Sequence, residues 1–149
     1  MGKYKFWYNI LGWMSFAIVL ISYIITMEKT GSLWDCGEFL SCTYKLQVAH
    51  PPGAPFYMML GKIFSLLSMG DTTKIAMMIN LLSAVAGAFC AFFFFGSSVS
   101  ILRIIFGVSE EDSIKTYFIL GSSFIGAVAS GFLDSMWFNA IEGEVYALS

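Results

Sequence analysis

The sequence predicts an all-α membrane protein with several spanning helices. Hydrophobic residues make up 58% of its 149 residues and charged residues only 12%, and the mean hydropathy is +0.76. Soluble domains carry roughly 25% charged residues, so this composition suits a lipid bilayer. The chain also contains several uncharged runs whose length is close to the ~20 residues that a helix needs to cross a hydrocarbon core. The net charge of -2 argues against nucleic acid as a partner, because nucleic-acid-binding domains present basic surfaces.

The first span is expected at residues 9–27, which read NILGWMSFAIVLISYIITM and contain no charge. Basic residues followed by an apolar run also describe a secretory signal. This run is long and rich in aromatic residues, however, and Met-Glu-Lys closes it instead of the small residues of a cleavage site. We therefore expect a helix that is retained in the membrane.

Two further spans are expected at residues 75–102 and 116–133. The first of them includes FCAFFFF and is long enough to cross with tilt. The second is rich in glycine, alanine and serine, which let helix backbones approach closely in a membrane. A fourth span is expected to start near residue 144, just before the sequence stops, so we expect the chain to be a fragment of a longer protein.

Between the first two spans, residues 28–74 form a loop that contains one further helix. Residues 56–69 are short for a span and include Lys62, and their apolar residues recur at i, i+3, i+4, i+7 and i+8. That pattern is typical of an amphipathic helix that lies on the membrane surface. With this helix on the surface, the loop and the segment after Leu133 fall on the same side of the membrane.

Basic residues near the span ends indicate which side this is. Lys3 and Lys5 precede the first span, and Arg103 and Lys115 bracket the loop between the second and third. The positive-inside rule places these residues in the cytoplasm. The lysines of the 28–74 loop compete with that count, although several lie far from a span end. The 28–74 loop is therefore predicted to face outward.

The outer side collects acidic residues and the single histidine, namely Asp35, Glu38, His50, Asp134, Glu142 and Glu144. Asp35 and Glu38 are three residues apart on an expected short helix. Two interpretations stay open for them: acids that favour the helix dipole in a first turn, or carboxylates drawn to the interface, where partial desolvation turns one into a useful base. Glu142 and Glu144 are either ordinary loop acids or functional acids at the bilayer edge.

His50 opens the sequence HPPG, which predicts a rigid turn. Pro51 and Pro52 fix φ and remove two backbone donors, and they bias the residue before them toward extended geometry. Rigid loops on a scaffold often hold functional side chains. We assign no metal site, because one histidine with scattered acids lacks the spacing of zinc ligands.

The segments WDCGEF, YKLQVAHPPGAPFYMML, INLLSA and WFNAIEGEVYAL together resemble a known family over nearly the whole chain from residue 9 onward. It is the N-terminal conserved domain of multi-spanning proteins common in Bacteroidetes, once catalogued as a domain of unknown function. A vertebrate endoplasmic-reticulum protein O-mannosyltransferase that modifies plexin-type receptors also belongs to it. The resemblance implies the N-terminal part of a C-type membrane glycosyltransferase module, with amphipathic surface helices in the first external loop.

The resemblance also implies roles for individual residues. Asp35 matches the catalytic acid of the first external loop, with Glu38 as its neighbour, and Glu144, beside Glu142, matches the acid of the second. The turn at His50, Pro51 and Pro52 matches the family's His-Pro-Pro turn; His50 with Lys45 is expected to bind the donor phosphate. The implied partners are membrane lipid, a polyprenyl-phosphate sugar and an exported protein acceptor. No cofactor is assigned, although a divalent metal is left open.

The implied reaction is transfer of a mannose-like sugar to Ser or Thr hydroxyls, on the periplasmic side of a bacterial inner membrane. One alternative is a noncatalytic scaffold or subunit whose acidic outer loop binds a partner. A transporter fragment is the other, but acids would then be expected inside the spans, and the uncharged runs contain none.

Overall fold

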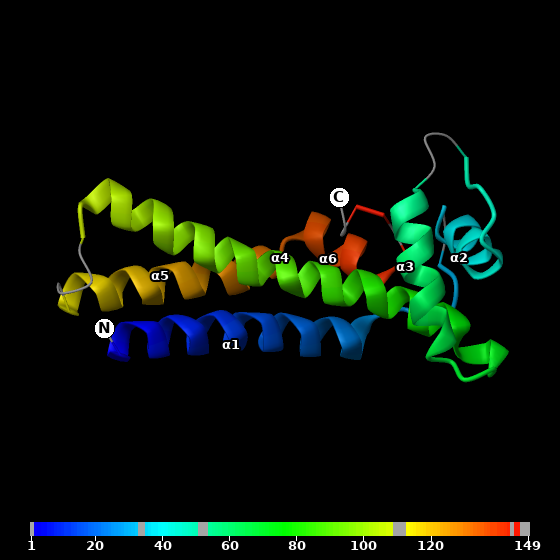
Figure 1. The fold of residues 1–149 in the computed structure, drawn as a ribbon, viewed down its shortest axis with the longest axis horizontal. Helices are drawn as coiled ribbons and strands as arrows, with labels where there is room; N and C mark the ends of the chain where they lie inside the picture. The colour runs from blue at the N-terminus through cyan, green and yellow to red at the C-terminus, as the bar shows by residue number, and fades with distance from the viewer. Residues whose placement is uncertain (1, 33–34, 51–53, 109–112, 144, 147–149) are drawn as a thin grey trace. The chain divides into compact units, whose positions relative to one another are not determined.

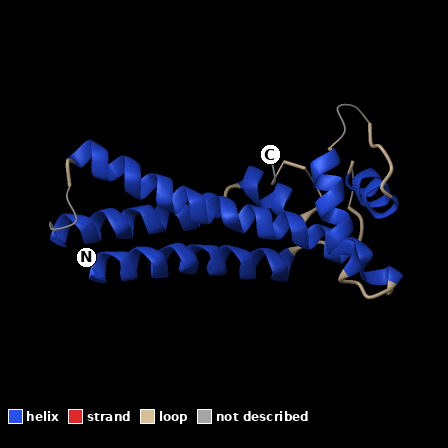
Figure 2. Ribbon diagram, viewed as in Figure 1, coloured by secondary structure: helices blue, strands red, loops and turns tan. Residues whose placement is uncertain are grey.

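The computed structural model describes residues 2–32, 35–50, 54–108, 113–143 and 145–146, and Figures 1 and 2 draw the helices within these ranges. Within these ranges every regular element is a helix, so the predicted all-α class is confirmed. The elements in chain order are α1 (Gly2–Thr26), α2 (Cys36–Lys45), α3 (Pro55–Leu66), the short 3-10 helix η1 (Thr72–Lys74), α4 (Ile75–Phe106), α5 (Ser113–Gly131) and α6 (Asp134–Ile141).

Two segments are long and apolar enough to cross a membrane, α1 and residues 72–106, which join η1 to α4. The number of candidate spans rises to three if α5 and α6, which are separated by a bend, form one span together. The expected spans 9–27, 75–102 and 116–133 fall on α1, α4 and α5. These helices indicate an integral membrane protein; where each one enters and leaves the bilayer stays a prediction. The expected fourth span begins at Glu144, which lies outside the described residues.

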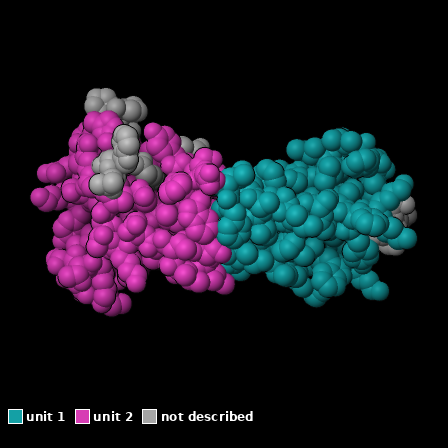
Figure 3. Space-filling view, turned by 180° about the vertical axis from the view of Figure 1, so that it is seen from behind, with its two compact units in different colours: residues 1–19, 88–133 teal, residues 20–87, 134–149 magenta. Residues whose placement is uncertain are grey.

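The chain divides into two compact units, coloured teal and magenta in Figure 3. Unit 1 consists of residues 1–19 and 88–133, and unit 2 of residues 20–87 and 134–149. Unit 2 therefore contains both the loop between the first two expected spans, α2 and α3 included, and the segment after Leu133.

Aromatic side chains pack α1 against α4 in unit 1. Ring centroids are 4.7 Å apart for Phe16 and Phe89, 4.9 Å for Trp13 and Phe92, and 5.4 Å for Tyr8 and Phe95. The FCAFFFF stretch thus supplies an interhelical contact. The small residues of α5 act as expected at Gly131, where an added Cβ would lie 2.7 Å from Val19 Cγ2, so only glycine lets these two backbones come so close.

Unit 2 is built around a cluster of buried side chains from α2, α3, the loop between them and the first turns of α4. The cluster consists of Cys36, Phe39, Leu40, Ala49, Tyr57, Met58, Ile79 and Leu82. α2 and α3 touch most closely at Gly61, where an added Cβ would lie 2.5 Å from Thr43 Cγ2. Lys62 strengthens the same contact, since its Nζ donates to the Tyr44 carbonyl at the C-terminal end of α2, where a positive charge is favourable.

The helix expected at residues 56–69 is α3, and it buries its less apolar side. Tyr57, Gly61 and Ser65 face the cluster, whereas the large apolar residues on the other side are exposed: Phe56, Met59, Ile63 and Leu66. An exposed apolar stripe on an otherwise packed helix suits contact with lipid. The position of α3 on the membrane surface stays a prediction that this stripe supports.

α6 is a helix that the sequence analysis did not anticipate. It packs within unit 2 through Ala140, because Gly87 of α4 leaves room for that residue: a Cβ on Gly87 would lie 2.9 Å from Ala140 Cβ. Trp137 also meets the Tyr23 ring edge-on, with centroids 5.5 Å apart. These contacts hold the end of α6, and with it Glu142, inside the unit that contains the first loop.

Candidate functional site

Asp35 immediately precedes α2. It occupies the N-cap position with φ -77° and ψ -9°, yet its side chain makes no capping hydrogen bond. Asp35 is exposed, while the next residue, Cys36, is completely buried. The local structure thus anchors the backbone beside Asp35 without using its carboxylate. Both interpretations that the sequence left open remain open, because an acid at this position can favour the helix dipole without a capping bond.

Glu38 lies one turn further along α2 and pairs with His50. One carboxylate oxygen, Oε1, accepts the His50 backbone N–H at 2.7 Å, and the other, Oε2, lies 3.0 Å from the ring nitrogen Nδ1. These hydrogen bonds, the backbone one first, hold the pKa of Glu38 below its ordinary value of 4.5. Glu38 is therefore ionised at neutral pH and acts only as an acceptor, which assigns the proton of the pair to Nδ1.

The packing around His50 fixes its ring as well. Its neighbour Ala49 is buried in the unit 2 cluster, and the Phe39 ring centroid lies 5.8 Å from that of the imidazole. Both members of the Glu38–His50 pair are nonetheless partly open to solvent, at 40% and 46% side-chain exposure. The pair is thus held in place by packing against the unit 2 cluster and is still accessible to solvent. A group that contacts substrate needs such access.

Asp35, Glu38 and His50 form one cluster. Each offers a ligand atom, and these atoms all lie within 4.8 Å of one another. Carboxylate oxygens and an imidazole nitrogen together can bind a divalent cation, so these are the residues that could hold a metal. The sequence assigned no metal site because linear spacing does not reveal this juxtaposition, which depends on the return of the chain after α2.

The second-loop acid Glu142 is brought to the same region. Its Oε2 accepts the hydroxyl of Ser32 at 2.6 Å, and the backbone N–H of Glu28 donates to Ile141 O at 3.0 Å. The residue after Glu142 packs directly on α2: a Cβ on Gly143 would lie 3.5 Å from Cys36 Sγ. The end of α6 is therefore tied to the chain on both sides of Asp35.

The other predicted site residues lie elsewhere or outside the described ranges. Lys45 is the last residue of α2, about 13 Å along the helix axis from its first residue. It is exposed and stands at the end of α2 away from Asp35. Pro51, Pro52 and Glu144 lie outside the described residues.

Asn80, in α4, is a site residue that the sequence analysis missed. It is completely buried, and its Nδ2 donates to the carbonyls of Glu28 and Thr30 at 2.8 and 3.3 Å. The available signal was a lone carboxamide inside an apolar run, since polar groups within a predicted span call for a partner. Ser32 was missed too, because a serine in a loop carries no signal of its own.

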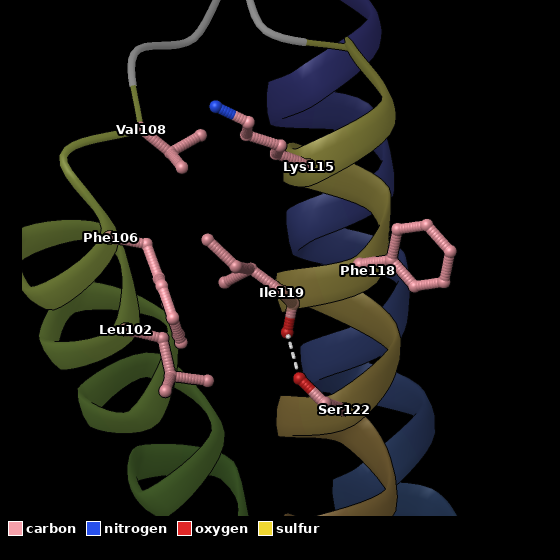
Figure 4. A pocket seen from close by; sticks show the side chains of 7 residues that line it. All are labelled: Leu102, Phe106, Val108, Lys115, Phe118, Ile119 and Ser122. Carbon is pink, nitrogen blue, oxygen red and sulfur yellow. Dashed lines mark hydrogen bonds between the residues drawn. The ribbon is translucent and has the colours of Figure 1, made fainter.

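Two cavities deserve comparison as binding places. One, in unit 1, measures about 470 Å³ and is lined by Leu102, Phe106, Val108, Lys115, Phe118, Ile119 and Ser122. Figure 4 shows Lys115 at the same end as Val108, with the Ser122 hydroxyl bonded to the Ile119 carbonyl. No carboxylate or imidazole lines it within the described part of the chain, so Lys115 is the ionisable side chain among these lining residues.

The second cavity belongs to unit 2 and adjoins the cluster. It measures about 340 Å³ and is lined by Leu46, Gln47, Val48, Ala49, Ala54, Pro55, Met58 and Met59. Its walls are almost wholly apolar, and they include Ala49, the residue immediately before His50. The polar cluster and the apolar cavity thus involve consecutive residues, His50 in the cluster and Ala49 in the cavity wall.

Comparisons with known proteins agree with the resemblance seen in the sequence. Residues 35–149 match the family model described as the protein O-mannosyl-transferase TMEM260 N-terminal domain, so the match begins at Asp35. The chain is 25% identical over 132 residues to protein O-mannosyl-transferase tmem260 of Dictyostelium discoideum, covering 87% of this chain and 14% of that protein. It is 32% identical over 77 residues to protein O-mannosyl-transferase TMEM260 of Mus musculus, covering 51% of this chain and 10% of that protein.

No solved structure matches the chain. The aligned region is a small part of each relative's length, 14% and 10%, so the likeness concerns only a small portion of these proteins. The family model nevertheless covers most of the present sequence, from the first-loop acid onward. The chain belongs to the family defined by the protein O-mannosyl-transferase TMEM260 N-terminal domain.

Proposed function

We propose that this chain is the part of a membrane glycosyltransferase that carries its first-loop catalytic acid. The transferase would move a mannose-like sugar from a polyprenyl-phosphate donor to Ser or Thr hydroxyls of exported proteins. The observation that carries the proposal is the Asp35 carboxylate, which is exposed, makes no capping bond and stands within 4.8 Å of the Glu38–His50 pair. The named activity of the two relatives supports the same reaction class.

In the proposed reaction Asp35 is the general base. It takes the proton from the acceptor hydroxyl while that oxygen forms a bond to the anomeric carbon of the sugar. The bond between the anomeric carbon and the phosphate oxygen breaks at the same time, and the polyprenyl phosphate leaves with the electron pair. Attack from the face opposite the leaving group inverts the anomeric centre. A correctly placed base contributes about 10²- to 10⁴-fold to such a step.

The leaving phosphate requires donors or positive charge nearby, and we assign this role to His50. Glu38, in this assignment, orients the imidazole through Nδ1 and stabilises its charged form. Lys45 was expected to share the role, and its position at the far end of α2 makes it the weaker candidate of the two. Glu142 and Glu144 are proposed to lie on the acceptor side, because Glu142 is tied to the segment that leads into Asp35.

The apolar cavity beside His50 is proposed to receive the first isoprene units of the donor. A polyprenyl phosphate joins a charged group directly to a hydrocarbon chain, and here His50 directly follows Ala49, which lines an almost wholly apolar cavity of about 340 Å³. The exposed apolar stripe of α3 would face lipid next to it. Donor phosphate and donor chain would then be recognised by neighbouring parts of one loop.

Filling this cavity is expected to weaken donor binding. Val48 is 91% exposed and lines the cavity, so Val48→Trp should occupy the space without disturbing the core. We expect the KM for a long-chain donor to rise about tenfold, the value of one to two buried methylene groups, with the acceptor KM unchanged. Ile63→Trp is the matched control, since Ile63 is an exposed α3 residue that does not line the cavity. Equal donor KM values for the two variants would contradict the assignment.

We also propose that the site faces the periplasm from a bacterial inner membrane. The basis is the distribution of basic residues, with Lys3, Lys5, Arg103 and Lys115 on the cytoplasmic side. An outward-facing site is what a transferase acting on exported proteins requires.

The proposal is tested by following a labelled sugar. Membranes that contain the full-length protein are given labelled mannose on polyprenyl phosphate, and exported proteins are examined for label released by β-elimination. We expect label to appear in these membranes and to be absent from membranes with Asp35→Asn. A lack of transfer from any polyprenyl-phosphate sugar, together with stable co-purification of another protein, would overturn the proposal in favour of a scaffold.

A further inference from the structure

We infer that Asn80 is a positioning residue that holds the start of the first external loop against the turn at Gly143, and so sets Asp35 relative to Glu142. The effect on catalysis rests on the proposed function, whereas the structural tie does not. All of the residues involved belong to unit 2.

The first half of the tie is the amide nitrogen of Asn80. Nδ2 donates to two carbonyls, Glu28 O at 2.8 Å and Thr30 O at 3.3 Å. Both carbonyls lie just after α1 in a segment without regular secondary structure, where the backbone must find its partners outside a helix. A single buried side chain from α4 thus replaces the hydrogen bonds that a helix would have supplied, and it fixes two successive points of the segment.

The second half is the amide oxygen, which faces the end of α6. An added Cβ on Gly143 would lie 2.9 Å from Asn80 Oδ1 and 3.1 Å from Leu40 Cδ2. Gly143 is therefore clamped between α4 and α2, with no space for a larger residue. Asn80 Oδ1 is buried, and no residue in the described ranges donates a hydrogen bond to it. Burial of an oxygen without a hydrogen bond costs stability, and the close approach of Gly143 shows that the residues after α6 cover this oxygen.

The carboxamide therefore stands between the two segments that carry the proposed acids. Thr30 leads through Ser32 to Asp35, and Ser32 donates to Glu142. Two ties join these segments directly, namely the Ser32–Glu142 hydrogen bond and the Glu28–Ile141 backbone bond. Asn80 contacts both segments, through Nδ2 at Glu28 and Thr30 and through Oδ1 at Gly143. Without its two donors, the segment before Asp35 would lose its attachment to α4.

The structural tie can be measured without any enzymatic activity. Ser32→Cys and Glu142→Cys are combined in the full-length protein, in a background with Cys42 and Cys90 replaced by alanine, and a short thiol-specific cross-linker is added. The two single-cysteine variants show whether the buried Cys36 reacts. The cross-linking rate is then compared between the parent, Asn80→Leu and Asn80→Asp. Asn80→Leu keeps the side-chain volume but removes the amide's donors and its acceptor. Asn80→Asp keeps the side-chain shape and removes only the donors.

We expect either Asn80 variant to slow cross-linking at least fivefold. Asn139→Leu is the matched control, because the Asn139 amide donates to Ser135 O within α6, and it should leave the rate unchanged. Size-exclusion profiles identify which variants fold, and Asn80→Asp serves if Asn80→Leu does not. A rate within twofold of the parent in a folded Asn80 variant would overturn the inference.

The catalytic consequence is measured separately, in the protein without added cysteines. We expect Asn80→Asp to lower kcat by about 10- to 100-fold, since small displacements of a reacting group have effects of this size, with the donor KM within twofold of the parent. A purely structural role would lower the yield of folded protein and leave kcat per folded molecule unchanged, which would overturn the positioning role. Slowed cross-linking in a protein whose parent transfers no sugar would uphold the tie and reject the proposed function alone.

Discussion

Replacing Asp35 with asparagine is expected to lower sugar transfer by about 10²- to 10⁴-fold, the usual contribution of a general base. The substitution keeps the shape of the side chain and removes only its ability to accept a proton. Because the Asp35 carboxylate makes no capping hydrogen bond, and because asparagine is itself a good N-cap residue, α2 should stay intact. Transfer of labelled sugar per folded molecule measures the effect.

The matched control for this experiment is Asp134→Asn. Asp134 is also an exposed acid at the start of a helix of unit 2, so the same charge change is made at a comparable place. We expect Asp134→Asn to keep full activity and Asp35→Asn to keep the detergent-solubilised Tm of the parent. Retention of more than half of the activity in Asp35→Asn would exclude Asp35 as the base and direct attention to the Glu38–His50 pair.

The membrane helices were the predictable part of this fold. Long uncharged runs admit few alternatives to a helix in lipid, because every backbone polar group must be satisfied within the segment. The expected spans accordingly fall on α1, α4 and α5. The short helix α6 was not foreseen, since its eight residues, DSMWFNAI, are too few to show a clear helical period. It exists because Gly87 makes room for it, and that contact joins residues far apart in the sequence.

The sequence was enough to name candidate residues for the site. It was not enough to predict the hydrogen bonds that join them. Counting spans predicted that Asp35, His50 and Glu142 lie on one side of the membrane, and the structure has all three in unit 2. The sequence could not show that Glu38 would bind His50 with both oxygens, because this depends on how the chain returns after α2. Asn80 shows the same limit: its polarity was visible in the sequence, but its partners, Glu28 and Thr30, could be identified only from the fold.

The pairing of Glu38 with His50 changes the role first expected for Glu38. As a neighbour of Asp35 it was expected to act at the catalytic centre. With both of its oxygens directed to His50, it is better placed to orient the imidazole than to accept a proton from substrate. This reassignment leaves Asp35 as the proposed base. It also makes the expected effect of Glu38 dependent on the presence of His50, which provides a direct test.

His50→Ala is expected to raise the KM for the polyprenyl-phosphate donor about tenfold, because a hydrogen bond to a charged group is lost. Glu38→Gln should raise it only about two- to fivefold, since glutamine can still accept from the ring and partly exposed ion pairs contribute little. Adding Glu38→Gln to His50→Ala should have no further effect if Glu38 acts through His50. Independent, multiplying effects of the two substitutions would contradict that role.

The pH dependence of donor binding separates the two residues. The pKa of Glu38 is lowered from 4.5, so the contribution of its ionised form is present above that value and is lost only as pH falls through the lower pKa. Glu38 therefore stays ionised between about pH 6 and 8, so a change in donor binding across this interval comes from another group. A rise in donor KM across this interval in the parent protein, absent from His50→Ala, is the result expected if the charged imidazole binds the phosphate. The same rise in His50→Ala would show that another group holds the donor.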